Sequence, residues 1–174
     1  MGYYKYMKNV YDTEEYTALM KERVISWAKE PVFVKIDRPT KLDRAHTLGY
    51  KAKQGFVMVR VRIGKGGSKR EKPAGGRKPL KAGMRKYTPE MNKQHIAEGR
   101  VAKKFINLEV LNSYYIAETG KFFWFEVILV DPQHPCIVKD KQIKWIRDQR
   151  GRVFRGLTSS GKSSRGLGRG RGFG

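Results

Sequence analysis

The clearest pattern in the first part of the chain is an amphipathic helix. Asp12 and Glu15 stand three residues apart, as acidic residues do at many helix starts. Apolar side chains then recur at helical spacing from Tyr16 to Trp27, and Pro31 forbids a further turn. The pattern predicts one helix that begins near Asp12 and ends before Pro31.

The next segment predicts extended chain and then a strand. Residues 32–54 show little periodicity, so we expect a mostly extended connection that begins with a short strand at residues 32–36. Between residues 55 and 64 apolar side chains alternate with others, which predicts a strand that places Arg60 and Arg62 on one face. We expect the apolar face to pack and the arginine face to meet solvent or a partner.

A second helix is predicted after residue 88. Thr88 fits an N-cap, Pro89 a first helical position, and Glu90 an acid near the positive end of the helix. The helix is expected to run to about Phe105.

A hairpin should follow this helix. Two apolar runs, at residues 108–116 and 122–130, flank a turn at residues 118–121, and their strands would form the centre of a sheet. The aromatic residues 122–125 favour core over a platform for bases, because alternate members of a strand face inward. A short helix or strand is expected within residues 141–146. The expected fold class is α+β, with a small, largely antiparallel sheet.

Two stretches hold too few apolar residues to fold alone. Residues 64–87 contain six glycines and two prolines and are rich in Lys and Arg, so we expect a long loop that is ordered by binding. From Arg150 onward there are eight glycines and no acid. The expected division is a single domain over residues 1–149, which contains the loop, and an extended basic tail over residues 150–174.

The distribution of charge also distinguishes these two stretches, because most of the net charge of +22 lies in or next to them. Residues 50–104 carry 17 Lys or Arg and three acids, a net charge of +14, and residues 150–174 carry +7. Residues 1–30 are neutral and residues 105–149 have a net charge of −1. Clustered like charges repel one another and destabilise a compact state, so the pattern indicates a polyanionic partner.

Nucleic acid is the partner that this composition fits best. Lys and Arg neutralise phosphates, and glycine permits close backbone approach, which suits a folded RNA better than the groove of a duplex. No helix-turn-helix, zinc-finger or basic-zipper pattern is present. The candidate RNA-binding residues are Arg38, Lys41, Arg44, Lys51, Lys53, Gln54, Arg60, Arg62, Lys65, Lys69, Arg70, Lys72, Arg77, Lys78, Lys81, Arg85, Lys86, Arg100, Arg150, Arg152, Arg155, Lys162, Arg165, Arg169 and Arg171. A protein that coats DNA without sequence preference is the alternative.

An enzymatic function is not indicated. Residues 156–163 match the G-x-x-x-x-G-K-[ST] pattern of a phosphate-binding loop, but that loop needs a strand before it and a helix after it, and the flanking composition predicts neither. No two carboxylates stand out as an acid and base pair, and most acids are expected at exposed positions.

A metal site is not indicated either. His134 and Cys136 lack further ligands nearby, and Cys136 is the only cysteine, so no internal disulfide can form. No signal peptide is evident, and the apolar runs are too short to span a bilayer. We expect a cytoplasmic protein with no cofactor, no metal site, no membrane contact and no small-molecule substrate.

Several sequence runs resemble a known family. Residues 38–40, Asp43 and residues 49–55 (Gly-Tyr-Lys-Ala-Lys-Gln-Gly) are similar to the large-subunit ribosomal protein family of the fifteen-e type, which is archaeal and eukaryotic. Further runs at residues 110–114, 126–132, 155–158 and 165–168 resemble its other signatures in the same order. The chain length and the His134-Pro135 pair are closer to archaeal members.

The resemblance implies a structural constituent of the large ribosomal subunit without catalytic activity. It implies a two-layer α and β core, with extensions that lie in grooves of the large-subunit ribosomal RNA. The expected partners are that RNA and neighbouring large-subunit proteins, not a second copy of the chain. Magnesium ions of the RNA would be the only metal nearby.

Overall fold

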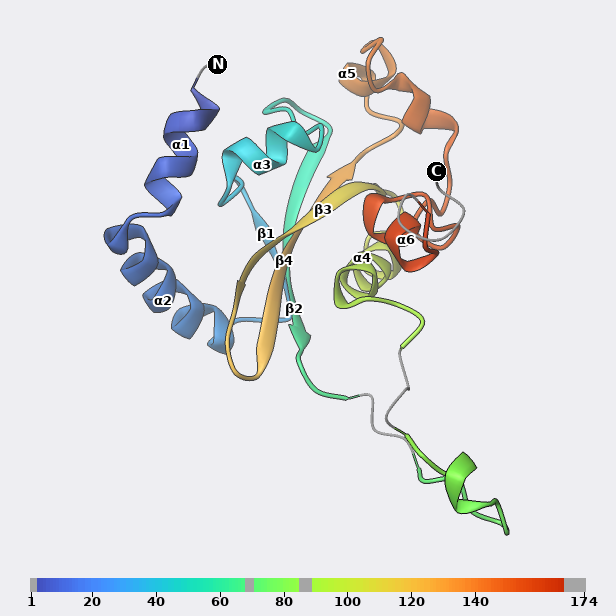
Figure 1. Cartoon of the computed structure of the whole chain (residues 1–174). Helices are drawn as coiled ribbons and strands as arrows, with labels where there is room; N and C mark the ends of the chain where they lie inside the picture. Colours follow the sequence, from blue (N-terminus) through green and yellow to red (C-terminus); the bar gives the residue numbers. More distant parts are fainter. Residues whose placement is uncertain (1–2, 68–70, 85–88, 168–174) are drawn as a thin grey trace.

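A four-stranded antiparallel sheet forms the centre of the molecule. The computed structural model describes residues 3–67, 71–84 and 89–167. Its strands are β1 (Phe33–Ile36), β2 (Phe56–Gly64), β3 (Glu109–Glu118) and β4 (Phe122–Val130), in the spatial order β1-β2-β4-β3 (Figure 1). All neighbouring strands pair antiparallel. The predicted strands, the hairpin and the α+β fold class are confirmed.

The strand β4 lies between β2 and β3 and is buried from Trp124 to Val130. Its side chains alternate between two apolar clusters, with Trp124 and Ile128 in one and Phe125 and Val127 in the other. Branched and aromatic residues pack well on both faces of a sheet, which explains why this run forms its centre. The prediction that residues 122–125 belong to the core is confirmed.

Helices cover both faces of the sheet, one layer more than the expected two-layer core. On one face, α2 (Glu14–Lys29) and α3 (Leu42–Thr47) pack against β4 through residues such as Trp27 and Ala45. On the other, α4 (Lys93–Lys104) packs through Ala97 and Val101, and α6 (Ser159–Ser164) lies beside it (Figure 1). Both faces of β4 are apolar, so each needs a cover.

The remaining helices lie at the edges of these layers. α1 (Tyr4–Tyr11) contacts α2 and α3, and Tyr4 is hydrogen-bonded to His46 at 2.9 Å. After β4, α5 (Pro135–Val138) and the 3-10 helix η2 (Lys144–Asp148) add apolar residues to the first cluster. η2 overlaps the predicted element at residues 141–146.

Three details of the helix predictions need correction. The helix expected from Asp12 to before Pro31 is confirmed as α2, but its cap is Thr13, which accepts a hydrogen bond from the Tyr16 N–H at 3.3 Å, and the sequence pattern did not predict α1 before it. The connection at residues 32–54 contains α3, which its sequence periodicity does not reveal. The helix expected from Thr88 begins at Lys93, where Asn92 caps it. Thr88 itself lies outside the described residues.

Candidate nucleic-acid interface

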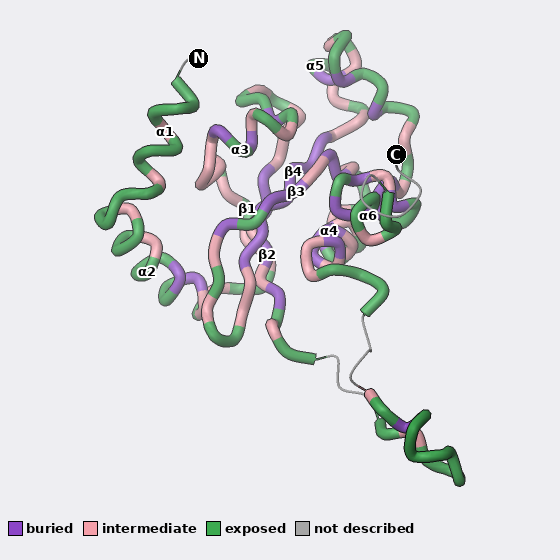
Figure 2. The backbone as a smooth tube through the Cα atoms, in the orientation of Figure 1, coloured by how far each residue is buried: buried purple, intermediate pink, exposed green. Residues whose placement is uncertain are grey.

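The basic loop, residues 64–87, leaves the sheet after β2 and returns to α4. The structure describes residues 64–67 and 71–84 of it, including the short 3-10 helix η1 (Pro79–Lys81). Residues 71–84 stand apart from the sheet and its helices (Figure 1), and they are almost wholly exposed (Figure 2). Even the apolar side chain of Leu80 is 95% exposed. This part of the loop gains little from packing within the protein.

Four candidate residues of the basic loop present free charge. Lys72, Arg77, Lys78 and Lys81 are all exposed. Within the described parts of the chain, no salt bridge joins any of them to an acid. Their charges are therefore available to a polyanion.

No atom of the described residues lies close to the glycines of the basic loop. An added Cβ at Gly66, Gly75, Gly76 or Gly83 would meet no atom within 4 Å. Gly75 and Gly76 have φ angles of +74° and +75°, which explains glycine there by conformation. Gly66 and Gly83 have neither a crowded neighbour nor a positive φ, so no contact or backbone angle of the described residues requires glycine at these positions.

The first residues of the loop are anchored to the sheet. Lys65 forms a salt bridge with Glu118 at 3.0 Å, and its backbone N–H donates to the Lys121 carbonyl at 2.8 Å. Lys93 of α4 donates to the Gly66 carbonyl at 2.9 Å. The chain therefore enters the loop from a fixed position on the β3–β4 hairpin.

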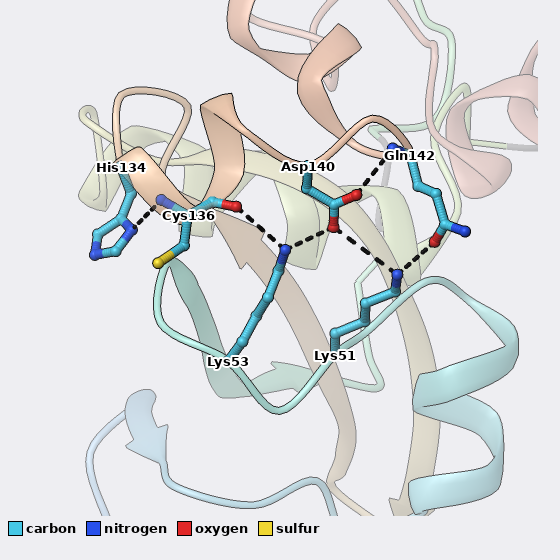
Figure 3. A network of polar contacts seen from close by, with 6 residues as sticks. All are labelled: Lys51, Lys53, His134, Cys136, Asp140 and Gln142. Atoms are coloured by element: carbon cyan, nitrogen blue, oxygen red, sulfur yellow. Dashed lines mark hydrogen bonds and ion pairs between the residues drawn. The ribbon is translucent and has the colours of Figure 1, made fainter.

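Two further candidate residues meet an acid of the protein. Figure 3 shows Lys51 and Lys53, which precede β2, on either side of Asp140. The Lys53 ammonium lies 2.6 Å from the Asp140 carboxylate and donates to the Cys136 carbonyl at 3.2 Å, and Lys51 bonds to Gln142. The hydrogen bond from Lys53 is the main reason that the pKa of Asp140 is lowered. These contacts hold the chain before β2 against α5.

Arg60 and Arg62 lie on the second face of β2 as predicted, but that face is covered by α2. Arg60 pairs with Glu30, and its guanidinium lies 4.1 Å from the ring centroid of Trp27. Arg62 donates to the Ala28 carbonyl and lies 4.7 Å from the centroid of Phe122. The expectation of a face open to solvent or a partner is wrong, because both guanidinium groups are used in packing the helix on the sheet.

The carboxyl-terminal segment, residues 150–174, is not extended over its described part, residues 150–167. Glu109 of β3 accepts a hydrogen bond from the Gly151 N–H at 2.8 Å. Arg152 is buried, and its guanidinium donates to the Val110 and Leu111 carbonyls at 2.7 and 3.1 Å. Val153 enters the apolar cluster beneath α4. The structure thus gives Arg152 an internal role and corrects the prediction of an extended tail here.

A buried carboxylate holds α6 in place. Glu98 of α4 is fully buried and accepts hydrogen bonds from Ser113 and, at 2.6 Å, from the hydroxyl of Thr158. The same Thr158 oxygen accepts the Gly161 N–H at 3.1 Å and so caps α6. Burial raises the pKa of Glu98, although both hydrogen bonds oppose that shift.

The same contacts bear on residues 156–163, which match the sequence pattern of a phosphate-binding loop. The short helix α6 lies within the motif rather than after it, and the described residues that follow, 165–167, form a turn. The preceding chain forms turns rather than a strand, as expected. The carboxyl group of Glu98 accepts a hydrogen bond from Thr158, the residue that caps α6, so an acidic side chain lies next to the helix start at which a nucleotide phosphate would bind. The residues present do not fit a phosphate loop.

The other candidate residues divide by exposure. Arg38, Arg44, Lys51, Gln54, Arg100, Arg150, Arg155, Lys162 and Arg165 are exposed, and Lys41, Lys53, Arg60, Arg62 and Lys65 are half-buried. Lys69, Arg70, Arg85, Lys86, Arg169 and Arg171 lie outside the described residues. Arg150, Arg155, Lys162 and Arg165 all belong to the carboxyl-terminal segment, and Arg100 lies on α4, which α6 contacts.

Sequence reasoning missed some residues at this surface. Lys103 and Phe154 are exposed next to Arg100 and line the same hollow. A helical wheel of α4 would have grouped Lys103 with Arg100, because residues three apart share a face. No sequence signal marks Phe154, because its position depends on the fold of the carboxyl-terminal segment.

The described residues hold neither a cluster of metal ligands nor a membrane-spanning helix. Among them, no group of three or more His, Cys, Asp or Glu side chains could hold a metal ion. In the same ranges, no helix is long and apolar enough to cross a membrane.

A comparison with protein families covers nearly the whole chain. The family model Ribosomal L15e, described as Ribosomal L15, matches residues 2–173. The match includes the basic loop and almost all of the carboxyl-terminal segment.

Proposed function

Because this chain belongs to the Ribosomal L15e family, we propose that its basic loop and its carboxyl-terminal segment bind and clamp large-subunit ribosomal RNA. Family membership gives the chain a structural role in the large ribosomal subunit and a place in the ribosome, in the cytoplasm. The proposal adds which parts of the chain contact the RNA and how they act. It also includes contacts with neighbouring large-subunit proteins, and it requires no cofactor, protein-bound metal or self-association.

The basic loop carries the proposal. Its described part buries little surface, and it presents Lys72, Arg77, Lys78 and Lys81 without acidic partners among the described residues. A segment of this kind gains its order from a polyanion, because phosphates neutralise the clustered charge and release counterions. The glycines without steric need allow an RNA backbone to approach closely.

A rigid junction between the two basic segments supports clamping. The loop ends at α4, whose capping residue Asn92 donates to the Ser160 carbonyl at 3.3 Å. The Asn92 side chain also accepts from the Ser160 hydroxyl at 2.8 Å. RNA elements bound by the loop and by α6 would therefore be tied together through α4.

A charge-deletion variant tests this proposal. Replacing Lys72, Arg77, Lys78 and Lys81 by Ala should weaken binding to large-subunit RNA. It should also lower the slope of log affinity against log salt by about one unit per lost phosphate contact. The matched control replaces Lys5, Lys21, Arg23 and Lys29, which are exposed on α1 and α2, and so removes the same charge elsewhere. Filter binding across a salt series measures both.

Comparison of the two variants distinguishes RNA binding by the basic loop from RNA binding by net charge alone. Equal losses in the two variants would show that net charge alone drives binding, and would contradict the assignment to the basic loop. Equal affinity of the native protein for duplex DNA and for ribosomal RNA would favour the alternative, a protein that coats DNA without preference.

A further inference from the structure

A hollow of about 370 Å³ lies between α4 and the first residues of the carboxyl-terminal segment. Its lining includes Met91, His95, Gly99, Arg100, Lys103 and Phe154. Phe154 is 59% exposed, and Arg100 and Lys103 are exposed as well. Among the described residues, the lining contains no carboxylate, so the hollow combines an aromatic ring and two cations without an acidic side chain beside them.

Gly99 in the wall of this hollow has no internal explanation. It lies inside α4, where glycine weakens a helix relative to alanine, and its φ is not in the left-handed region. An added Cβ would lie 3.9 Å from Phe154 and 4.0 Å from Val153, which is ordinary contact. Alanine would therefore fit the free protein. Glycine at this position keeps the helix backbone open to a ligand.

His95 lines the same hollow and has a ring nitrogen without a partner among the described residues. Its Nε2 lies 3.1 Å from the Val153 carbonyl oxygen. A carbonyl only accepts, so Nε2 carries the proton and Nδ1 is left as an acceptor. Nδ1 is buried and has no partner in the structure. Buried polar atoms are nearly always paired, and the described residues supply no donor to this one.

We propose that this hollow binds a single unpaired nucleotide of RNA. The base stacks on Phe154, the phosphates lie at Arg100 and Lys103, and Nδ1 of His95 accepts a hydrogen bond from an amino or 2′-hydroxyl group. Exposed aromatic rings beside cations bind bases by stacking, and a base is available for this only when it is unstacked from its helix. The inference rests on the proposed RNA-binding function and adds recognition of a flipped-out base.

Three RNA hairpins test it with the full chain. One has a single bulged adenosine, one has an abasic residue at the bulge, and one is fully paired. The native protein should bind the bulged adenosine about tenfold more tightly than the abasic hairpin, as expected for one stacked base. Phe154→Ala should bind these two hairpins equally, and Phe154→Tyr should restore the preference. Binding to the fully paired hairpin should not change.

Two variants separate this site from folding. Gly99→Ala should raise the melting temperature and yet lose the preference for the bulged adenosine, because the methyl group narrows the hollow. Tyr6→Ala, which removes a ring that is 70% exposed on α1, should keep the preference.

The controls distinguish the failure of each proposal. Equal binding of the native protein to the bulged and abasic hairpins, or a preserved preference in Phe154→Ala, overturns this inference. If the paired hairpin is still bound with a normal salt dependence in that case, the proposed function stands. Absence of binding to all three hairpins overturns both.

Discussion

At the scale of single residues, two buried carboxylates are the most consequential groups. Glu98 and Glu126 are both fully buried, against the expectation of exposed acids. Glu126 accepts hydrogen bonds from the backbone and hydroxyl of Thr40 and from Tyr114, and so ties the chain before α3 to the sheet. A buried charge is tolerated only with such partners. The sequence does not mark these acids, because their donors lie far away along the chain.

These carboxylates predict that mild acid stabilises the protein. Burial raises the pKa of Glu126 and of Glu98 above the ordinary 4.5. A raised folded pKa gives stability that is fully present below pH 4.5 and is lost as the pH rises through the folded value. Melting temperatures should therefore rise as the pH is lowered from neutral towards 5, and Glu126→Gln should flatten that rise.

The measurement is thermal unfolding across this pH range. Asp140 acts in the opposite direction, because its pKa is lowered, but its effect is lost only as the pH falls below its ordinary 3.8. Parallel pH profiles for the native protein and Glu126→Gln would contradict the assignment to Glu126.

A second residue prediction concerns Gly161. Its Cβ, if present, would lie 2.7 Å from the Gly156 Cα, and backbone cannot give way as a side chain can. Gly161→Ala should destabilise the protein by about 1–3 kcal/mol, the usual cost of overpacking. Urea unfolding compares it with Gly83→Ala, whose methyl group would meet open space. Equal midpoints would show that α6 adapts to the added atom.

At the scale of elements, the sequence predicts the helices and strands that depend on local interactions and misses those that depend on contacts with residues far away along the chain. β2 and β3 alternate apolar positions for a local reason, the pleat of the strand, and β4 is a run of aromatic and branched residues, so their sequence predicts all three. α6 has the composition of a loop and depends on Glu98, which lies 60 residues before Thr158. α4 has two plausible caps, Thr88 and Asn92, and local sequence does not choose between them. Long-range contacts decide the elements that were missed.

The cap of α6 gives a prediction at this scale. Thr158→Ala removes both the cap and a donor to the buried Glu98. We expect a loss of about 1–3 kcal/mol in the free energy of unfolding, from a missing cap and an underpaired buried acid. The control is Ser163→Ala, an exposed position of the same helix. Denaturant unfolding with equal losses in the two variants would contradict the role of Thr158.

At the scale of the whole molecule, charge is unevenly distributed over the fold. Residues 1–30, which form α1 and α2, are neutral, while the chain from residue 50 to residue 104 carries +14. Composition predicts this asymmetry, and it predicts the exposed lysines and arginines of the basic loop. It fails for Arg60, Arg62 and Arg152, because a formal charge does not tell whether its side chain faces a partner or a carbonyl of the same protein.

Sedimentation tests the molecule as a whole. The tagged protein should sediment with the large subunit in a sucrose gradient and remain there after a high-salt wash, because a component built into the RNA does not exchange as a surface-bound cation does. A control protein of similar size and charge that binds nucleic acid nonspecifically should wash off. Release into the light fractions would contradict a clamping role.

The central place of β4 has a consequence for the way this protein is made. β2 leaves the ribosome well before β4, which is its partner in the sheet and ends at Val130. Until then, one edge of β2 lacks the strand that pairs with it, and the most basic part of the chain follows directly behind β2. During synthesis the nascent chain therefore has an unpaired strand edge and a strong positive charge. It can aggregate, and it can bind prematurely to any RNA nearby. We therefore expect this protein to depend on a chaperone that binds the nascent chain more than other proteins of its size do.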